Sequence, residues 1–306
     1  MFISVGSVII DDIVLPDGTT HMGCLGGGGT HAVMGMRVWS EQVGLVANIG
    51  YDFPSSLMNK LKKVFDVRGL ITLDAKTIRA WQLFETDGTR REVLRSDLYD
   101  FSQLEIDIHD FPDVFDELQG VHLHTESNQV ALWESFLRQR GNPFILWEPW
   151  QRDCVPENRD KLIDVLPLVD CVSPNLEEAR LLMGLENTED ILKKYLEYGA
   201  KRVVIREGAS GSTFADSQGN FIRVPIANVE EVVDQTGAGN AYCGGLLVGF
   251  FQSDKIQEAL CRAAVSASFP LEQFGALFSL ENIKQRAESR YRPCMAAMLD
   301  MNHELQ

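Results

Sequence analysis

Short apolar runs rich in β-branched residues alternate with segments of helical periodicity along most of the chain. Runs of this length between turn signals are typical of buried strands, and longer periodic segments are typical of helices. The alternation predicts right-handed β-α-β units and a mostly parallel sheet with helices on both faces. The expected strands are 2–10, 43–47, 120–123, 143–148, 168–173 and 202–205, and the expected helices are 30–42, 129–140, 176–183, 188–198 and the chain from 253 onward.

Two Asp-Gly pairs interrupt this alternation. Asp17-Gly18 follows the first strand, and Asp87-Gly88 lies within 77–95, a segment of strand-like composition. Asp-Gly favours tight hairpins because glycine tolerates positive φ. The two excursions, at about 12–25 and 76–96, predict a small β-sheet lid over the carboxyl edge of the main sheet; two unrelated surface hairpins are the alternative. No linker divides the chain, so we expect 1–306 to form one α/β domain.

Charge and composition exclude several classes of partner. The 28 basic and 44 acidic residues give a formal net charge of -16, which disfavours nucleic acid and anionic lipid as partners. The longest apolar stretch, 244–251, is far shorter than the roughly 20 residues of a membrane span. The six cysteines have no metal-ligand spacing and suit free thiols in a reducing compartment. With no leader-like segment before the first strand, we expect a cytoplasmic protein.

The small residues Thr236-Gly237-Ala238-Gly239 stand directly before a long apolar segment of helical length. Glycine at 237 and 239 leaves the backbone N–H groups open to an approaching anion. A helix that begins there adds its own unsatisfied N–H groups and the positive end of its dipole. The turn therefore predicts a backbone site for a phosphoryl group, although a buried helix with glycines for close packing would have the same appearance.

The string from Asp234 to Asn240 resembles the second signature of the ribokinase-like (PfkB) family of small-molecule kinases, usually D-T-x-G-A-G-D. In that family the glycines form an anion hole and the last Asp is the general base. The first signature, G-G-x-x-x-N-x-A, resembles 26–33, which begins Gly26-Gly27-Gly28-Gly29. In the family these glycines let the backbone approach the substrate.

Further matches follow in collinear order, and the resemblance runs from about residue 2 to about 285. They are the opening strand that ends in Asp11, a G-x-D at 50–52, a D-x-N-x-R position at 148–152, the N-x-x-E at 175–178, a nucleotide-side strand end at 203–208 and a glycine turn at 274–276. The G-x-x-x-x-G-K-[ST] motif, the complete G-x-G-x-x-G and H-E-x-x-H are absent from the sequence, which disfavours P-loop enzymes, dehydrogenases and this class of metalloenzyme.

The resemblance implies an ATP-dependent phosphotransferase that acts on a hydroxyl group of a small carbohydrate, nucleoside or polyol. It implies Mg²⁺ with the nucleotide, and homodimers that pair through the lid. The residues implied are Gly237, Ala238, Gly239 and Asn240 for transfer; Asp11, Gly26, Gly27, Gly28, His31 and Asp234 for substrate; Asn175, Glu178, Arg206, Gly208, Thr236 and Gly275 for nucleotide; and Glu178 for the metal.

Several positions depart from the family pattern. Asn240 replaces the usual Asp, and an amide cannot hold a proton at neutral pH. His31 stands where Asn is usual, Trp150 replaces a second Asn, and Arg206 with Glu207 stands where Thr and an apolar residue are common. Two hypotheses follow: a kinase in which His31 or another pocket group replaces the base, or a non-catalytic binding or regulatory protein. His122 and His124, on an expected buried strand, suit packing better than a substrate role.

Overall fold

The computed structural model describes residues 1–86, 90–95, 105–115 and 117–303. Its largest element is a nine-stranded sheet in the order β13-β12-β11-β10-β9-β8-β1-β4-β5. The neighbouring strands β5, β4, β1, β8, β9, β10 and β11 run parallel to one another. At the β11 side, β12 and β13 extend the sheet with antiparallel pairing. The strands are β1 Phe2–Val5, β4 Val43–Gly50, β5 Asp66–Leu73, β8 Gly120–Thr125, β9 Phe144–Pro149, β10 Cys171–Val172, β11 Arg202–Arg206, β12 Ser212–Asp216 and β13 Phe221–Val224.

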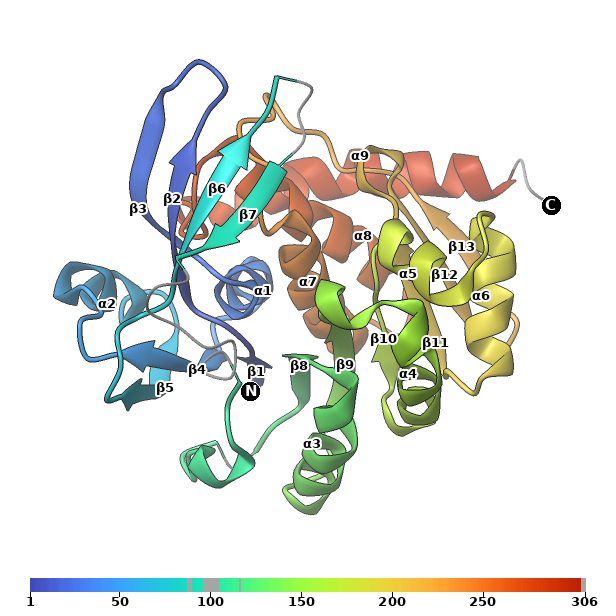
Figure 1. Ribbon diagram of the computed structural model, residues 1–306. Coiled ribbons are helices and arrows are strands. Elements are labelled where there is room, and N and C mark those ends of the chain that lie inside the picture. The colour runs from blue at the N-terminus through green and yellow to red at the C-terminus, as the bar shows by residue number, and fades with distance from the viewer. Residues whose placement is uncertain (87–89, 96–104, 116, 304–306) are drawn as a thin grey trace.

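Helices cover both faces of this sheet (Figure 1). On one face α1 packs against α7, α7 against α8 and α8 against α9; on the other, α3 packs against α4 and α5 against α6. The helices are α1 Gly28–Arg37, α2 Ser55–Leu61, α3 Ser127–Gln139, α4 Arg159–Val165, α5 Leu176–Met183, α6 Thr188–Glu197, α7 Ala238–Gln252, α8 Ile256–Ser268 and α9 Ile283–His303. The predicted α/β class, with helices on two faces of a mostly parallel sheet, is confirmed.

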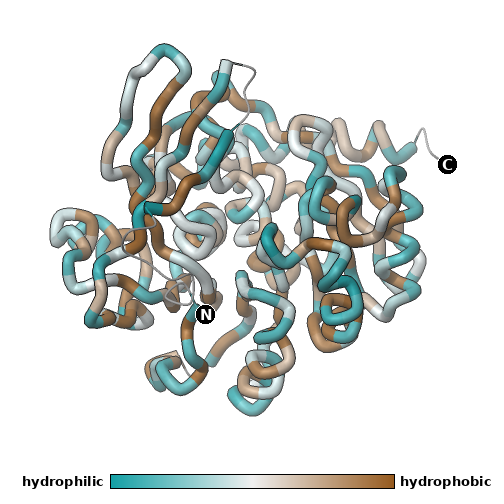
Figure 2. The backbone as a smooth tube through the Cα atoms, viewed as in Figure 1, coloured by the Kyte–Doolittle hydropathy of each residue, from teal (hydrophilic) through white to brown (hydrophobic). Residues whose placement is uncertain are grey.

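Two apolar cores result from the period-two alternation of the strands. Along β11, Val204 packs into the core under α7 and α8, whereas Val203 and Ile205 pack into the core under α5 and α6. Both faces of such a strand are buried, which is why the sequence shows continuous apolar runs rather than polar alternation. Figure 2 shows these hydrophobic stretches in the middle of the molecule, while the outer helices alternate between hydrophobic and hydrophilic residues.

A second, four-stranded sheet stands beside the carboxyl edge of the main sheet (Figure 1). It contains β3 Thr20–Gly26, β2 Ile9–Val14, β6 Arg79–Phe84 and β7 Arg90–Leu94 in that order. The two outer pairs are antiparallel and the central β2–β6 pair is parallel. The hairpin predicted at Asp17-Gly18 is confirmed, with Gly18 at φ 84. The turn predicted at Asp87-Gly88 lies outside the described residues, and pairing of two such sheets into a dimer stays a prediction.

The strand predicted over 2–10 is in fact two strands in different sheets, β1 and β2. The chain leaves the main sheet at Gly6 and Ser7 because Ser7 bonds the start of α1 instead of a strand. Its carbonyl accepts from the N–H of Gly29 at 3.1 Å, and its hydroxyl accepts from that of Gly28 at 3.1 Å. Helix also does not continue unbroken from 253, since residues 273–282 between α8 and α9 are non-helical. Among the described residues, no helix has the length and apolar character to cross a membrane.

Candidate active site

A cavity of about 710 Å³ opens where the carboxyl ends of the main-sheet strands, the small sheet and the start of α7 meet. Its volume is in the range of small-molecule sites, and this edge of a parallel sheet is where such sites occur. Most of the predicted site residues line it: Asp11, Gly27, Gly28, His31, Asn175, Glu178, Arg206, Gly208, Thr236, Gly237, Ala238, Gly239 and Asn240. Among the described residues, Gly26, Asp234 and Gly275 do not line this cavity.

Each of these three residues instead supports a neighbour. Asp234 is buried, and its carboxylate accepts the N–H of Thr236 at 2.8 Å, which shapes the turn before α7. Gly26 lies against the carboxylate of Asp11, and a side chain at 26 would collide with it. Gly275, at φ 78, lets the chain turn so that the Ala276 N–H reaches the Leu25 carbonyl at 2.7 Å. Direct ligand contacts for these three residues stay predictions.

The turn at Thr236–Gly239 has the form that its glycines predict. Gly237 adopts φ 75, and α7 begins at the next residue. Within the described part of the chain, no side chain caps the N–H groups of this helix start. Side chains at the two glycines would have no room, because a Cβ on Gly237 would collide with the ring of His31 and one on Gly239 with the guanidinium of Arg206. The first-turn amides therefore face the cavity without an internal side-chain acceptor.

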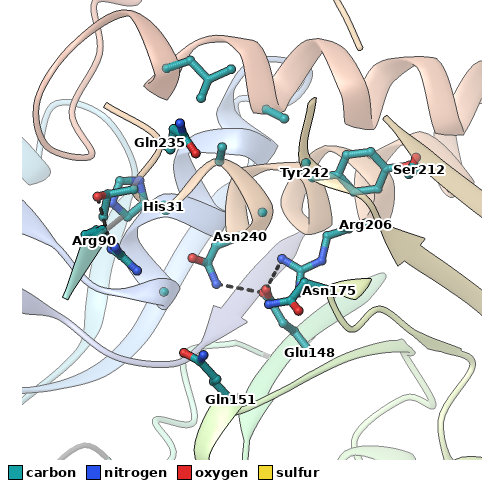
Figure 3. A pocket seen from close by; sticks show the side chains of 18 of the residues that line it. His31, Arg90, Glu148, Gln151, Asn175, Arg206, Ser212, Gln235, Asn240 and Tyr242 are labelled. Carbon is teal, nitrogen blue, oxygen red and sulfur yellow. Dashed lines mark hydrogen bonds and ion pairs between the residues drawn. The ribbon is translucent and has the colours of Figure 1, made fainter. Parts of the chain in front are cut away.

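Behind this turn, Glu148 contacts three side chains from separate elements, and Figure 3 shows two of these contacts, with Arg206 and Asn240. Its Oε1 lies 2.7 Å from Nη1 of Arg206, at the end of β11. Its Oε2 lies 2.8 Å from Nε2 of His122, on β8, and accepts the Asn240 amide N–H at 2.9 Å. Glu148, Arg206 and Asn240 meet because β9 and β11 end at the same edge of the sheet, where α7 begins. His122 reaches Glu148 from the neighbouring strand β8.

This arrangement keeps Glu148 ionised. Burial alone raises the pKa of a carboxyl, but the Arg206 guanidinium and the hydrogen bond to His122 outweigh burial and hold the pKa of Glu148 well below its usual range. The same attraction raises the pKa of Arg206 despite burial. Glu178 differs: burial raises its pKa, with Arg206 opposing that rise less effectively from 3.8 Å.

The contact with Glu148 fixes the orientation of the Asn240 amide. An ionised carboxylate only accepts hydrogen bonds, so the group that faces it is the NH₂ of Asn240. The amide oxygen then points to the opposite side, as Figure 3 shows. Asn240 thus presents a hydrogen-bond acceptor, without a proton-binding group, at the position where the resemblance places the general base.

Polar side chains of the small sheet form the other half of the cavity. Asp11 is buried, and its Oδ1 accepts from Gln82 at 2.9 Å, while Gln82 also donates to Glu92 at 2.9 Å. Burial raises the pKa of Asp11 to about 7, against the opposing hydrogen bond from Gln82. Arg90 reaches from β7 to the turn, where its Nη1 donates to the Thr236 hydroxyl at 3.2 Å.

Two histidines in the cavity wall are held neutral. Burial, together with weaker repulsion from Arg90, lowers the pKa of His31 to about 4. Burial likewise lowers the pKa of His124 to about 4, although Glu148 opposes the change. Among the described residues, neither ring nitrogen of His31 has a hydrogen-bond partner. The hypothesis that His31 replaces the base is untested, but a group with this pKa accepts a proton at neutral pH only at a cost.

The sequence-based site omitted several residues that line the cavity, notably Gln82, Arg90, Glu92, His124 and Glu148. A signal for two of them was present: Arg90 and Glu92 are two residues apart on one strand and therefore share a face. Trp150, noted only as a departure, forms part of the wall, packs on Ile9 and donates through its indole N–H to the His124 carbonyl at 2.9 Å.

The carboxylates on the nucleotide side do not suit a divalent ion held between them. Glu148 already has partners on both oxygens, and the Arg206 guanidinium occupies the space toward Glu178. Oε2 of Glu178 accepts the Asn175 N–H at 2.8 Å in a helix capping box. His122, Glu148 and Cys243 place ligand atoms within 4.8 Å of one another, but the same guanidinium neutralises that group. The metal role of Glu178 stays a prediction.

Comparisons with known proteins identify the family to which this sequence is similar. A sequence model described as pfkB family carbohydrate kinase matches residues 2–283. A cytidine kinase of Thermococcus kodakarensis is 29% identical over 277 residues, which cover 89% of this chain and 96% of that protein.

Two solved structures share the fold. A nucleoside kinase of Burkholderia thailandensis in complex with inosine has a TM-score of 0.78 at 15% identity and covers 96% of this chain and 97% of its own. A putative ribokinase II of E. coli in complex with ATP and Mg²⁺ has a TM-score of 0.75 at 19% identity, with 94% and 99% covered. The predicted ribokinase-like fold is confirmed.

Proposed function

The chain belongs to the pfkB family of carbohydrate kinases, and on that basis we propose that it transfers the γ-phosphoryl group of ATP to a hydroxyl group of a nucleoside, small carbohydrate or similar polyol. The observation that carries the proposal is the turn at Gly237–Gly239, whose helix start faces the cavity and is capped by no side chain of the described residues. Amides in this position bind anions and stabilise the charge that develops during transfer.

The two halves of the cavity suit the two substrates. ATP lies across Asn175, Glu178, Arg206, Gly208 and the turn. The hydroxylated substrate lies under the small sheet, where Asp11, Gln82 and Glu92 offer acceptors for several hydroxyl groups. Nucleosides come first among the candidates because two of the similar proteins are named cytidine kinase and nucleoside kinase.

Asn240 holds the attacking hydroxyl in this proposal. Its amide oxygen accepts the hydroxyl hydrogen bond, while its NH₂ group stays on Glu148. Phosphoryl transfer passes through a loose transition state in most analyses, so positioning and electrostatic stabilisation account for most of the acceleration. A general base adds on the order of 10² to 10⁴-fold. The amide at 240 therefore predicts a slow kinase rather than an inactive one.

A second candidate function is a non-catalytic binding or regulatory protein, and the hydrogen bond between Asn240 and Glu148 is the observation that favours it. The amide at 240 is bonded to Glu148 rather than free, and such a network stabilises a ligand-binding pocket without supplying a base. A protein of this kind would bind nucleotide or substrate and release no phosphorylated product.

The discriminating experiment incubates the full chain with Mg·ATP and a panel of nucleosides, sugars and polyols, and measures phosphorylated product and ADP. We expect product from at least one acceptor. We expect Asn240→Asp to raise its rate by about 10² or more, because the new carboxylate supplies the missing base. The adjacent Glu148 carboxylate should raise the pKa of that group toward neutral, which suits a general base. Gly239→Val serves as the inactive control.

Thermal unfolding in the same conditions separates the outcomes, because a ligand that binds only the folded state raises its stability. ATP-dependent stabilisation without product from either the wild type or Asn240→Asp would support the binding protein. Neither stabilisation nor product would contradict both candidates. The proposal places the enzyme in the cytoplasm, which is consistent with its six free cysteines.

A further inference from the structure

Arg206 is a cation at the centre of the nucleotide half of the cavity, at a position where Thr is common in the family. It ends β11, and its side chain is only 12% exposed. Nη1 lies 2.7 Å from Glu148, Nη2 lies 3.8 Å from Glu178, and Nη2 donates to the Ser173 carbonyl at 3.0 Å. These contacts hold the guanidinium between two buried carboxylates.

The guanidinium also retains hydrogen-bonding capacity. It has five N–H donors, and the described hydrogen bonds engage Nη1 with Glu148 and Nη2 with Ser173. Among the described residues, its Nε has no partner, but this atom is buried, so the donors left for a ligand are those of Nη1 and Nη2. Nη1 lies directly against Gly239, where any side chain would collide with it. The cation and its remaining donors are therefore adjacent to the open amides of the turn, and Arg206 lines the cavity with them.

We propose that Arg206 is a fixed cation that binds the phosphates of the nucleotide at the Gly237–Gly239 turn, so that nucleotide binding requires no divalent metal ion. The inference rests on the proposed function, because it concerns the same nucleotide site. Guanidinium groups suit this task because they are always charged and donate in a fork that matches phosphate oxygens.

Arg206 also closes the space in which a metal would be held. Both oxygens of Glu148 have partners, and one oxygen of Glu178 is bonded to the helix cap at Asn175. A divalent ion between Glu148 and Glu178 would meet a like charge in a site of low dielectric constant. Any Mg²⁺ that arrives with ATP therefore stays on the phosphates, away from this pair.

The test is calorimetric binding of ATP to the full chain in EDTA and in excess Mg²⁺. For the wild type we expect dissociation constants that agree within about threefold, which is a small difference in free energy. Arg206→Thr, which restores the common family residue, should lose about 10- to 100-fold in affinity in EDTA. Mg²⁺ should recover part of that loss. Arg202→Thr is the matched control, since Arg202 begins the same strand outside the cavity, and it should behave like the wild type.

The outcomes separate the inference from the proposed function. Wild-type binding of ATP that requires Mg²⁺ would overturn the inference and leave the kinase proposal standing. Failure of the folded wild type to bind ATP in either condition would overturn both. Since the wild-type comparison needs no variant, the inference stays testable even if Arg206→Thr does not fold.

A second measurement uses Mn²⁺ alone, followed by electron paramagnetic resonance. The wild type should take up no Mn²⁺ at this site, whereas Arg206→Thr should gain one ion by freeing Glu148 and Glu178. Arg206→Lys keeps the charge and should exclude Mn²⁺. Uptake by the wild type that is lost in Glu178→Gln would contradict the proposal.

Discussion

Asp11 and Glu148 are two buried carboxyl groups in one cavity, and their pKa values shift in opposite directions. Burial raises the pKa of Asp11 to about 7, because its nearest partner is the neutral amide of Gln82 and Glu92 and Asp234 add negative charge nearby. The pKa of Glu148 is held well below its usual range, because Arg206 and His122 outweigh the same effect of burial. Desolvation acts on both groups, and the partner decides the result.

This difference in pKa separates the nucleotide side of the cavity, which contains Glu148, from the substrate side, which contains Asp11. The nucleotide side has a carboxylate neutralised by a protein cation, so an anionic ligand there meets little net repulsion. On the substrate side, Asp11 is hydrogen-bonded to the neutral amide of Gln82, and the opposing attraction of Arg90 is weaker than the effect of burial. Asp11 can therefore exchange protons and hydrogen bonds with an incoming hydroxyl near neutral pH. The predictions below test each side by altering the feature that sets it apart.

Gly239→Val should have the largest effect. A β-branched side chain at 239 collides with the Arg206 guanidinium and moves it away from Glu148, and it also fills the space before the amides of the turn. We expect transfer to fall by about 10³-fold or more. Asn240→Ala should cost less, because it leaves those amides open. Steady-state kinetics of the two variants check the order, and equal losses would contradict the role assigned to the turn.

Glu148→Leu should have the second-largest effect, and it alters only the nucleotide side of the cavity, where Glu148 forms an ion pair with Arg206. Removal of the carboxylate leaves the buried Arg206 guanidinium with only the more distant Glu178 carboxylate, at 3.8 Å, and we expect a cost of about 3 kcal/mol of folding free energy. Urea denaturation measures the loss. Adding Arg206→Met should restore most of it, because the orphaned charge is removed as well.

The matched control for this pair is Glu134→Leu, which breaks the more exposed Arg138–Glu134 pair on α3 and should cost less than about 1 kcal/mol. A double variant of Glu148 and Arg206 no more stable than Glu148→Leu would show that the two charges do not act as a pair.

Asp11→Asn tests the substrate side, where we expect ionisation of the buried carboxyl to lower the folding stability as pH rises. The folded protein keeps the proton of Asp11 up to about pH 7, whereas the unfolded chain releases it near the ordinary value of 3.8. Stability from this group therefore falls as pH rises from about 4 to 7. The variant should be more stable than the wild type by roughly 2–4 kcal/mol at pH 8, and equal to it near pH 4.

Glu148 gives the reverse dependence, since its lowered pKa contributes stability above about pH 4.5 that is lost as pH falls below that value. Urea denaturation of the wild type and Asp11→Asn across this range checks both signs. Parallel curves for the two proteins would show that Asp11 ionises normally.

The parts of this site that depend on neighbours in sequence were predictable, and the parts that depend on tertiary contact were not. The turn at 236–239 needs only its glycines and the helix that follows, so the local string was enough to predict its form. The small sheet was predictable from Asp-Gly turns and strand composition. The break at Gly6 and Ser7 was missed, because it depends on hydrogen bonds to the start of α1, more than 20 residues away.

The sequence also presented Asn240 and Arg206 as unrelated departures. In the structure both contact Glu148, itself at a position where the family usually has Asp. A cation at 206 binds the carboxylate, and an amide at 240 can then share that carboxylate without the repulsion that a second acid would meet. No local pattern could link residues 148, 206 and 240, because they meet only when β9 and β11 align in the sheet and the start of α7 packs against their ends.

His31→Asn should have the smallest effect, and it decides whether a titrating group has replaced the missing base. His31 is 2% exposed, and burial lowers the pKa of its ring to about 4, which keeps it neutral at physiological pH. If Asn240 acts by orientation, as proposed, restoring the common family residue at 31 should change the transfer rate by less than about tenfold. The acid limb of the pH–rate profile should stay where it is. A rate that falls by 10² or more, with that limb displaced, would make His31 the proton acceptor. The substrate side would then work through an imidazole, and the raised pKa of Asp11 would reflect burial alone.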